Sequence, residues 1–373
     1  MVNTKKMGII FSNMHDKSLH ELTEQRTTSS IPFGARYRFI DFVLSSMVNS
    51  GIHSVGVIAR NNYESLMDHL GSGRDWDLAR KNGGLYLLPP YGNQTAGMYH
   101  GRIEALQGMM TYLNRSTAQY VVLSDSDLIC NLNFNDIISY HEEKNAEITI
   151  AYTKKYLETD RASSSTVFSL NGGGRITDVL VNPAGAGEQN LCLNIMVIER
   201  KLLIRLVNEE YSRGHTSFTK DILQKRCGSL EIYGYECSGY ISKIDSIKDY
   251  FDANMDLLNA DVRHNLFLSG RSIYTKVTDQ VPTRYGLNSK TSNCFIADGC
   301  LIEGEVHNSI ISRGVYIGRG AVVRNSVIMN SCRIGENANL DNCILDKFVI
   351  VNERRTLIGA ETYPTFISKS SIV

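Results

Sequence analysis

The sequence predicts an α/β domain built on a mostly parallel sheet, followed by a domain of stacked parallel β-helix coils. Short apolar runs alternate with helix-like stretches through the first two-thirds of the chain, and the last third repeats a short unit. We place the α/β domain at residues 1–260, a linker at 261–290 and the β-helix at 291–373. Alternation of strands and helices is typical of a parallel sheet with helices on both faces, which binds ligands at the carboxyl ends of its strands.

Apolar spacing and stop signals define the elements of the first domain. The helix expected at residues 39–48 has helical apolar spacing, and Asn49, Ser50 and Gly51 supply its stop signal. Compact apolar runs predict the strands. The expected strands cover residues 8–11, 54–58, 120–123 and 147–152, and the further expected helices cover residues 102–113 and 134–143.

An asparagine begins each of four repeats in the last third, at Asn293, Asn308, Asn325 and Asn342. The separations are 15, 17 and 17 residues, and apolar residues recur within the units at every sixth position. Three hexapeptides form one coil of a parallel β-helix, whose stacked coils bury an apolar column while Asn and Gly serve the corners. A chance run of β-hairpins is the alternative, and four spaced copies argue against it. Because an end of a β-helix leaves an open coil, we expect oligomerisation through this domain.

The composition argues against several classes of function. The 373 residues include 39 Lys and Arg against 39 Asp and Glu, and this zero net charge argues against nucleic acid or an anionic membrane as the main partner. No apolar run approaches the roughly 18–20 residues that span a bilayer. The eight cysteines form no Cys-x-x-Cys pair, so we expect reduced, mostly buried thiols in a cytoplasmic protein.

A dense motif near the N-terminus carries a family resemblance. Fifteen positions between residues 22 and 52 match in register, at Leu22, Thr23, Arg26, Phe33, Gly34, Arg38, Ile40, Asp41, Phe42, Leu44, Ser45, Asn49, Ser50, Gly51 and Ile52. They resemble the ADP-glucose pyrophosphorylase family. Residues 98–101, 218–222 and 253–257 also resemble family segments, so the resemblance covers nearly the whole chain.

The resemblance implies a Rossmann-like nucleotidyltransferase domain followed by a left-handed parallel β-helix of hexapeptide repeats. Family members join glucose-1-phosphate and ATP to make ADP-glucose, the glucosyl donor for glycogen. This reaction needs cations to neutralise phosphate charge and carboxylates to hold Mg²⁺.

The family's nucleotide-binding loop is altered here. Glycines in this loop let the backbone approach a triphosphate. Asn13, Met14 and Asp16 stand at the glycine positions, and Ser18 stands at the arginine position. The family's lysine in the next segment becomes Thr28. Side chains therefore crowd the loop, and Asp16 would repel a triphosphate.

The family's two metal-holding aspartates are also replaced. The first aligns with Ser126, although Asp125 and Asp127 flank it and a shift of one residue would put either in its place. The second aligns with Lys243, so Mg²⁺ should not bind in the family's two-carboxylate manner. We expect Lys243 to pair with Asp127 or Asp125 in the metal's place. The alternative is a shifted segment in which Lys243 points to solvent.

Four vestigial substrate-binding positions complete the family's site. Tyr99 and Gly101 belong to a matching segment. Asn182 replaces the lysine that grips the sugar phosphate, and Ser217 replaces an aspartate. With Ser18, Thr28, Ser126 and Lys243 also substituted, no catalytic position is intact.

Three arginines persist in the neighbourhood where the family binds phosphorylated effectors, namely Arg26, Arg36 and Arg38. Arginine forks suit phosphate, so we expect an effector or phosphate site here. A solvated face or a structural pair such as Arg38 with Asp41 is the alternative.

The pattern resembles the GlgD type of the family, a paralogue of the catalytic subunit in Gram-positive bacteria. It implies a regulatory subunit of a hetero-oligomer, expected to be a heterotetramer with the catalytic subunit, that responds to a phosphorylated sugar effector. A homo-oligomer of this chain alone is also open. The chain itself would need no cofactor, and Mg²⁺ would serve the catalytic partner. Two alternatives remain open, an active glucose-1-phosphate adenylyltransferase that uses unusual residues and a stand-alone phosphosugar sensor or scaffold.

Overall fold

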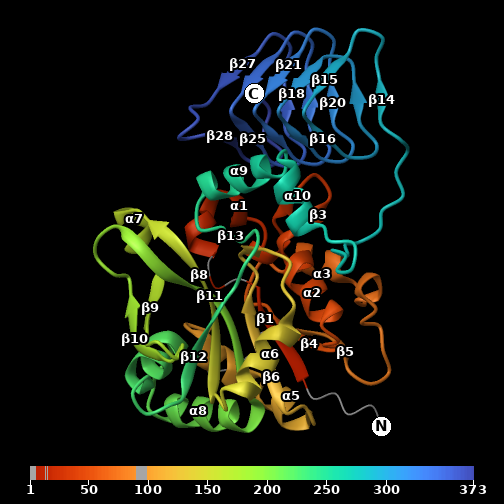
Figure 1. The fold of residues 1–373 in the computed structure, drawn as a ribbon. Helices are drawn as coiled ribbons and strands as arrows, with labels where there is room; N and C mark the ends of the chain where they lie inside the picture. Colours follow the sequence, from red (N-terminus) through yellow and green to blue (C-terminus); the bar gives the residue numbers. More distant parts are fainter. Residues whose placement is uncertain (1–5, 13, 15, 90–98) are drawn as a thin grey trace.

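The computed structural model describes residues 6–12, 14, 16–89 and 99–373. Asn13 of the altered loop and Met98 of the segment 98–101 lie outside the described residues. The predicted fold class is confirmed, with an α/β domain beneath a β-helix (Figure 1). Among the described residues, no helix combines the length and the apolar character that crossing a membrane would require.

Nine strands of the described chain form one mixed sheet in the first domain. Seven run in the order β10-β9-β11-β6-β1-β4-β5, while β8 pairs with both β11 and β12. Because β1 pairs in parallel with β4 and β6, the carboxyl ends of these three strands meet at one edge. The strands are β1 (Lys6–Phe11), β4 (Ser54–Ile58), β5 (Gly84–Leu88), β6 (Tyr120–Asp125), β8 (Ile148–Leu157), β9 (Thr166–Leu170), β10 (Ile176–Val181), β11 (Gly187–Glu199) and β12 (Ile232–Glu236).

The strand β11 was not expected from the sequence, and it changes the topology of the sheet. We expected the strand at 147–152 to continue a parallel series after the strand at 120–123. Instead β11 lies between β6 and β8 and runs antiparallel to both. The sheet is therefore mixed, because a later segment of the chain returns to occupy the position beside β6.

The expected helices at 39–48 and 134–143 are present as α2 (Phe39–Asn49) and α6 (Phe134–Glu143). The single helix expected at 102–113 is two helices, α4 (Arg102–Gly108) and α5 (Met110–Arg115), because Met109 between them has non-helical dihedral angles. The remaining helices are α1 (His20–Thr23), α3 (Glu64–Leu70), α7 (Thr159–Ala162), α8 (Arg200–Ser212), α9 (Ile247–Asp256) and α10 (Ala260–Leu266).

The two faces of the sheet pack in separate apolar clusters. Ile9 of β1 belongs to the cluster that includes α4, α5 and α8, whereas its neighbour Ile10 belongs to the cluster that includes α2 and α6. This alternation is the period of two expected of a strand. Gly8 allows α2 to approach β1 closely, because a Cβ atom there would lie 2.4 Å from the sulfur of Met47.

Three parallel sheets of five strands each form the described β-helix. The first contains β14 (Arg284–Tyr285), β17 (Leu301–Ile302), β20 (Tyr316–Ile317), β23 (Arg333–Ile334) and β26 (Ile350–Val351). The second contains β15 (Lys290–Ser292), β18 (Glu305–His307), β21 (Val322–Arg324), β24 (Asn339–Asp341) and β27 (Thr356–Ile358). The third contains β16 (Phe295–Ile296), β19 (Ile310–Ile311), β22 (Val327–Ile328), β25 (Cys343–Leu345) and β28 (Thr365–Ile367).

The repeated asparagines stand at one corner of successive coils. Asn293, Asn308, Asn325 and Asn342 have φ angles of 49°, 46°, 43° and 51°, in the left-handed region that asparagine tolerates better than most residues. The next residue in each repeat is Ser or Cys, and its side chain donates to the carbonyl two residues earlier. Ser309 Oγ then accepts from Ser326 N of the next coil at 3.1 Å, and Ser326 Oγ accepts from Cys343 N at 3.1 Å. The repeat therefore encodes a hydrogen-bonded corner.

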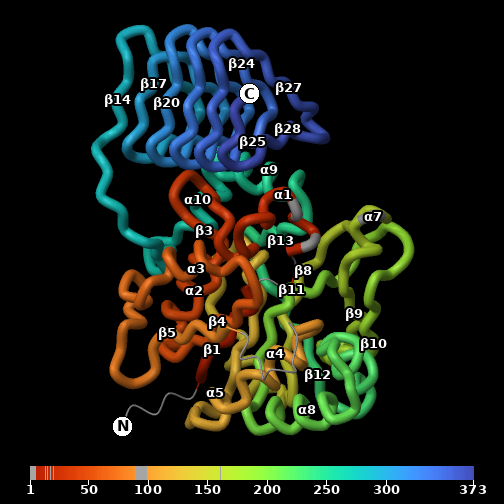
Figure 2. The backbone as a smooth tube through the Cα atoms, turned by 180° about the vertical axis from the view of Figure 1, so that it is seen from behind, coloured from red at the N-terminus to blue at the C-terminus, as the bar shows by residue number. Residues whose placement is uncertain are grey.

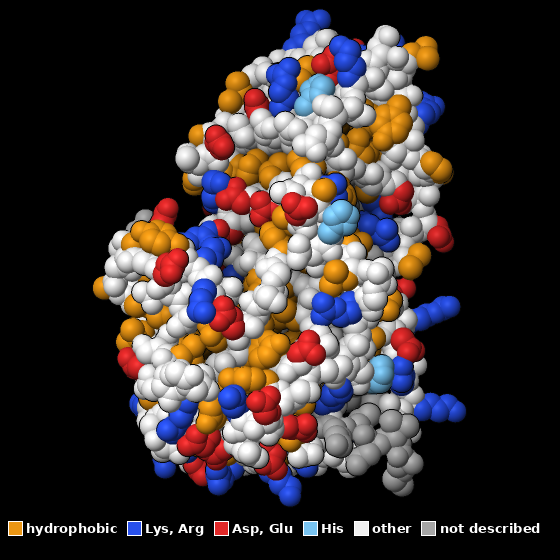
Figure 3. All heavy atoms as spheres, in the orientation of Figure 1, with side chains coloured by type: hydrophobic (Ala, Val, Ile, Leu, Met, Phe, Trp, Pro, Cys, Tyr) orange, Lys and Arg blue, Asp and Glu red, His pale blue; other side chains and the backbone are white. Residues whose placement is uncertain are grey.

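The third sheet of the β-helix packs against the first domain. Ile310, Val327 and Ile344 share one apolar cluster with Phe39 of α2 and Tyr250 of α9. Residues 267–283 lead from α10 to β14 along one side of the molecule (Figure 2). On the face drawn in Figure 3, the outline is notched between the β-helix and the part of the first domain that carries α7.

Candidate functional site

The site expected from the sequence lies where β1 and β6 end side by side. Phe11 pairs with Asp125 in the sheet register, and Ser126 and Asp127 follow directly. Each of these three polar residues is at most 2% exposed. The short strand β13 (Ser242–Lys243) pairs with β7 (Leu128–Ile129), which places Lys243 opposite Leu128 and beside this segment.

Lys243 lies inside the protein, with 8% of its side chain exposed. The alternative that it points to solvent is therefore wrong. Its ammonium group forms an ion pair with Asp245 at 3.3 Å. Burial acts to lower the pKa of Lys243, but the carboxylates of Asp245 and Asp127 outweigh it and the pKa lies above its usual value. A direct pair of Lys243 with Asp127 or Asp125 stays a prediction, although both carboxylates act on it electrostatically.

Asp125 faces a second cation, Arg102 at the start of α4. The two side chains form an ion pair in which the carboxylate is 1% exposed. The guanidinium group of Arg102 also lies over the ring of Phe11, 5.6 Å from its centre. The aspartate that could have served a metal is thus matched by a fixed positive charge.

The hydroxyl group of Ser126 is engaged in hydrogen bonds with neighbouring protein groups. Its Oγ lies 2.5 Å from Ser29 Oγ and donates to the carbonyl of Phe11 at 3.2 Å. No three His, Cys, Asp or Glu side chains within the described residues gather as a metal site would require. With Arg102 and Lys243 beside the two flanking aspartates, these side chains do not fit a two-carboxylate Mg²⁺ site.

Asp16 of the nucleotide loop and Thr28 of the next segment, both substituted positions, bind each other. The carboxylate of Asp16 accepts hydrogen bonds from Thr28 N at 3.0 Å and from Thr28 Oγ1 at 2.7 Å. Ser29 N and Ser29 Oγ both donate to the carbonyl of Ser12. From the sequence, Asp16 is expected only to repel a triphosphate, because nothing local indicates a partner 12 residues away. Ser18 is exposed.

Two vestigial substrate positions, Gly101 and Ser217, lie close together. A Cβ atom on Gly101 would lie 2.2 Å from the carbonyl oxygen of Thr216, so only glycine fits. Ser217 caps the π-helical turn Phe218–Gln224, with its Oγ accepting from Lys220 N at 3.2 Å and its N donating to Asp221 at 3.1 Å.

The other two substrate positions have different surroundings. Tyr99 is half-buried and packs against the apolar cluster of α4. Asn182 is exposed in the turn after β10, with a φ of 57° and its backbone N–H bonded to the carbonyl of Ser165 at 2.8 Å. The left-handed φ explains an asparagine at this position without any ligand.

The three arginines expected to bind phosphate have three different surroundings. Arg26 is 3% exposed and donates to both carboxylate oxygens of Asp346 in the β-helix, at 2.8 Å each. Arg38 donates to the carbonyl and hydroxyl oxygens of Ser65, and burial lowers its pKa. Its backbone N–H, rather than its guanidinium group, reaches Asp41. Arg36 is exposed, with its guanidinium group 5.5 Å from the ring centre of Tyr37.

Arg36 and Arg38 line a cavity of about 330 Å³ between the two domains. The first domain, residues 276–280 of the connecting segment and corners of three β-helix coils all contribute to its wall. The charged side chains in the lining are Arg36, Arg38, Lys276, Arg313, Lys347 and Asp68. Five cations against one carboxylate make this a place for an anion. Sequence reasoning missed Lys276, Arg313 and Lys347, because only the docking of the domains brings them to the arginines.

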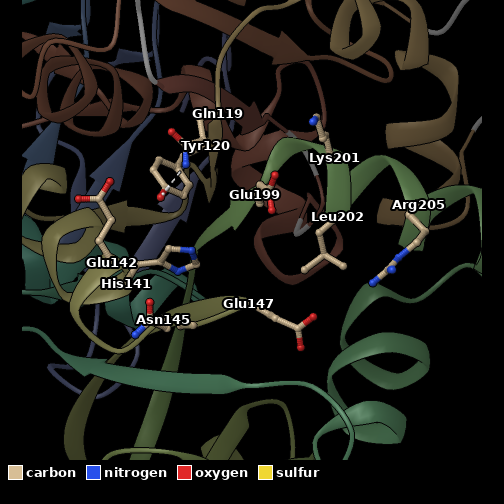
Figure 4. Close-up of a pocket in the computed structure, with 11 residues that line it drawn as sticks. Gln119, Tyr120, His141, Glu142, Asn145, Glu147, Glu199, Lys201, Leu202 and Arg205 are labelled. Atoms are coloured by element: carbon tan, nitrogen blue, oxygen red, sulfur yellow. Dashed lines mark hydrogen bonds between the residues drawn. The ribbon is translucent and has the colours of Figure 1, made fainter.

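A second cavity, of about 790 Å³, lies near the amino-terminal end of β6 (Figure 4). Its lining mixes three glutamates with Lys201 and Arg205 and contains no residue that the sequence analysis singled out. Burial lowers the pKa of His141 there to about 4, and the ring contacts Thr149 Oγ1 at 2.8 Å. An uncharged imidazole in a lining of mixed charge favours a structural role for this region.

Comparisons with known proteins agree with this architecture. Residues 8–260 match the nucleotidyl transferase family, and residues 278–363 match the GlmU-like C-terminal hexapeptide family. The chain is 33% identical over 373 residues to the glycogen biosynthesis protein GlgD of Bacillus subtilis, covering 100% of this chain and 98% of that protein. It is 37% identical over 323 residues to GlgD of Geobacillus stearothermophilus, covering 86% and 84% of the two chains. It is 36% identical over 325 residues to the glucose-1-phosphate adenylyltransferase of Thermotoga maritima, covering 85% and 76%.

Proposed function

The chain belongs to the nucleotidyl transferase family that includes the GlgD glycogen biosynthesis proteins and the glucose-1-phosphate adenylyltransferases, and from this premise we propose that it serves glycogen biosynthesis as a modulating subunit of ADP-glucose pyrophosphorylase. In this proposal the chain does not itself catalyse nucleotidyl transfer. It assembles with a catalytic subunit, raises the rate of that subunit and changes its response to effectors.

The buried ammonium group of Lys243 carries the proposal. It stands where the family resemblance places a metal-holding carboxylate, and Asp245 pairs with it. A fixed cation beside Asp127 opposes the binding of a divalent cation to that carboxylate by charge repulsion. The ion pair of Arg102 with Asp125 supports the same proposal, because it neutralises a carboxylate that could otherwise hold a metal. The hydrogen bonds between Asp16 and Thr28 also support it, because they join two positions where the family resemblance places a glycine and a lysine.

The interdomain cavity supports a regulatory role. Its cations come from the first domain, the connecting segment and the β-helix together. An anion bound there, such as a phosphorylated sugar, would therefore contact both domains at once. We propose that this cavity is the effector site, with Arg36 and Arg38 as ligands and Arg26 as the buried support of the joint.

The ends of the β-helix support assembly with a partner. Apolar side chains near the last coil are exposed, including Ile358 at 65%, Tyr363 at 75% and Ile372 at 67%. Edge strands and apolar patches of this kind are stabilised when another chain covers them. We propose that the catalytic subunit does so in a heterotetramer.

A mixing experiment tests the proposed function. We expect this chain alone to form no ADP-glucose from ATP, glucose-1-phosphate and Mg²⁺, and the mixture with its catalytic paralogue to exceed the rate of that paralogue alone. The matched variant is Asp127→Asn, which removes the carboxylate that an unusual active site would use while keeping its shape. The increase on mixing should survive this change.

The other outcomes point to the alternatives. Mg²⁺-dependent turnover by this chain alone that disappears in Asp127→Asn would identify an active adenylyltransferase and overturn the proposal. Failure to alter the rate, the effector response or the assembly state of the paralogue would leave a stand-alone sensor or scaffold as the better reading.

A further inference from the structure

Lys347 differs from the other lysine of the interdomain cavity in its ion pairing. It follows Asp346, whose carboxylate accepts from Lys347 N at 2.6 Å and binds Arg26. No carboxylate of the described residues lies within ion-pair distance of its ammonium group, whereas Lys276 pairs with Asp68 and Arg313 pairs with Asp298. Lys347 thus lines the cavity without forming an ion pair with a carboxylate of the described residues.

The charges around Lys347 are predominantly positive. Burial lowers its pKa to about 7, Arg38, Arg26 and Lys369 act in the same direction, and Asp346 opposes them. Arg36 and Arg313 add positive charge to the cavity wall. Among the other titratable groups of the lining, Tyr37 has a pKa that burial raises, His69 is paired with Asp41 at 2.6 Å, and Asp68 is paired with Lys276. These surroundings therefore disfavour a positive charge on Lys347.

We propose that an anion enters this cavity together with a proton, which Lys347 accepts, so that the site holds its ligand at neutral pH and releases it at alkaline pH. The inference rests on the proposed effector site and adds its control by pH. An anion a few ångströms from an amine favours the charged form of that amine. By linkage, the proton must then strengthen the binding of the anion by the same factor.

The wall of the cavity also indicates the chemical class of the ligand. Arginine forks at Arg36 and Arg313 match the oxygens of a phosphate ester. Asn330, Ser331 and Gln280 supply uncharged hydrogen-bonding groups beside them. A dianionic phosphate on a polyhydroxylated carbon skeleton would use both kinds of group.

Sulfate is the suitable probe, because it remains a dianion across the relevant pH range whereas phosphate itself titrates. Calorimetry of the full chain at constant ionic strength would measure sulfate affinity from pH 6.5 to pH 9. With an amine that is about half protonated at pH 7 and about 1% protonated at pH 9, we expect the affinity to fall by up to about 50-fold between these values. Repeating the titration at pH 8 in buffers of different ionisation enthalpy should reveal uptake of nearly one proton.

Two substitutions identify the titrating group. Lys347→Arg keeps a permanent charge, so its sulfate affinity should stay nearly constant from pH 7 to pH 9. Lys347→Met should bind weakly at every pH, and Lys290→Met, which changes an exposed lysine outside the cavity lining, should behave like the unaltered protein. Thermal unfolding would establish that each variant is folded.

The outcomes separate the inference from the proposed site. Sulfate binding without pH dependence, or a pH dependence that survives in Lys347→Arg, would overturn the role of Lys347 and leave the effector site standing. Absence of sulfate binding at every pH would overturn the effector site itself, and the inference with it.

Discussion

At the scale of single residues, the contact between Arg26 and Asp346 joins positions that are 320 residues apart. The family resemblance picked out Arg26 as a phosphate ligand, because the motif around it is dense and in register. The motif could not reveal Asp346, which belongs to a different domain. For Lys243, the alignment of two short segments predicted a position near Asp127, and the Asp127 carboxylate does act on Lys243 electrostatically. The ion pair of Lys243 with Asp245 was not predicted.

Arg26 and Asp346 should contribute strongly to stability, because both groups are buried. Arg26→Met would leave the Asp346 carboxylate inside the protein without its cation, and we expect the free energy of unfolding to fall by about 3–5 kcal/mol. The control is Arg175→Met, which removes the partly exposed pair with Glu231 and should cost about 1 kcal/mol or less. Denaturant unfolding of both variants would measure the difference. Equal, small losses would mean that the interdomain pair is not structurally important.

At the scale of elements, periodic features were predictable and non-local pairing was not. The coils were predicted from the asparagine repeat, at Asn293, Asn308, Asn325 and Asn342. This was possible because a corner with left-handed φ favours asparagine, which can be recognised in the local sequence. The bounds of α6 were also readable, because its apolar spacing is local. The position of β11 was not, since strand order depends on which segments meet after the chain has folded.

The corner asparagines can be tested by exploiting their backbone conformation. At Asn342, whose φ is 51°, alanine must adopt a left-handed conformation and we expect a loss of about 1–2 kcal/mol in the free energy of unfolding. Asn342→Gly should cost clearly less than Asn342→Ala, because glycine reaches this conformation freely. Denaturant unfolding of the two variants would compare them directly. Alanine as stable as glycine would show that the corner does not require this φ.

At the scale of the whole molecule, the two domains share one apolar cluster. Phe39 and Tyr250 of the first domain pack with Ile344 of the β-helix, and the buried pair of Arg26 and Asp346 lies at the same joint. Neither domain therefore completes its own interior. The sequence predicted both domains from their patterns, but it gave no sign of how closely they dock, because docking depends on surfaces that form only after folding.

This shared interior predicts cooperative unfolding. We expect a single calorimetric transition for the full chain, since separation of the domains would expose the cluster to water. Arg26→Met should lower the temperature of that transition, and in a weakened joint the first domain and the β-helix should begin to unfold separately. Two resolved transitions in the unaltered protein would contradict the expectation.

The hydrogen bonds between Asp16 and Thr28 have a consequence for evolutionary history. Returning position 16 to the family's glycine would leave Thr28 N and Thr28 Oγ1 without their acceptor in a buried place, which costs stability. If position 28 alone were returned to lysine, its ammonium group would lie beside the Asp16 carboxylate and would pair with it rather than with a nucleotide. Neither reversion is favourable without the other. The two substitutions therefore depend on each other, and each makes the other hard to undo.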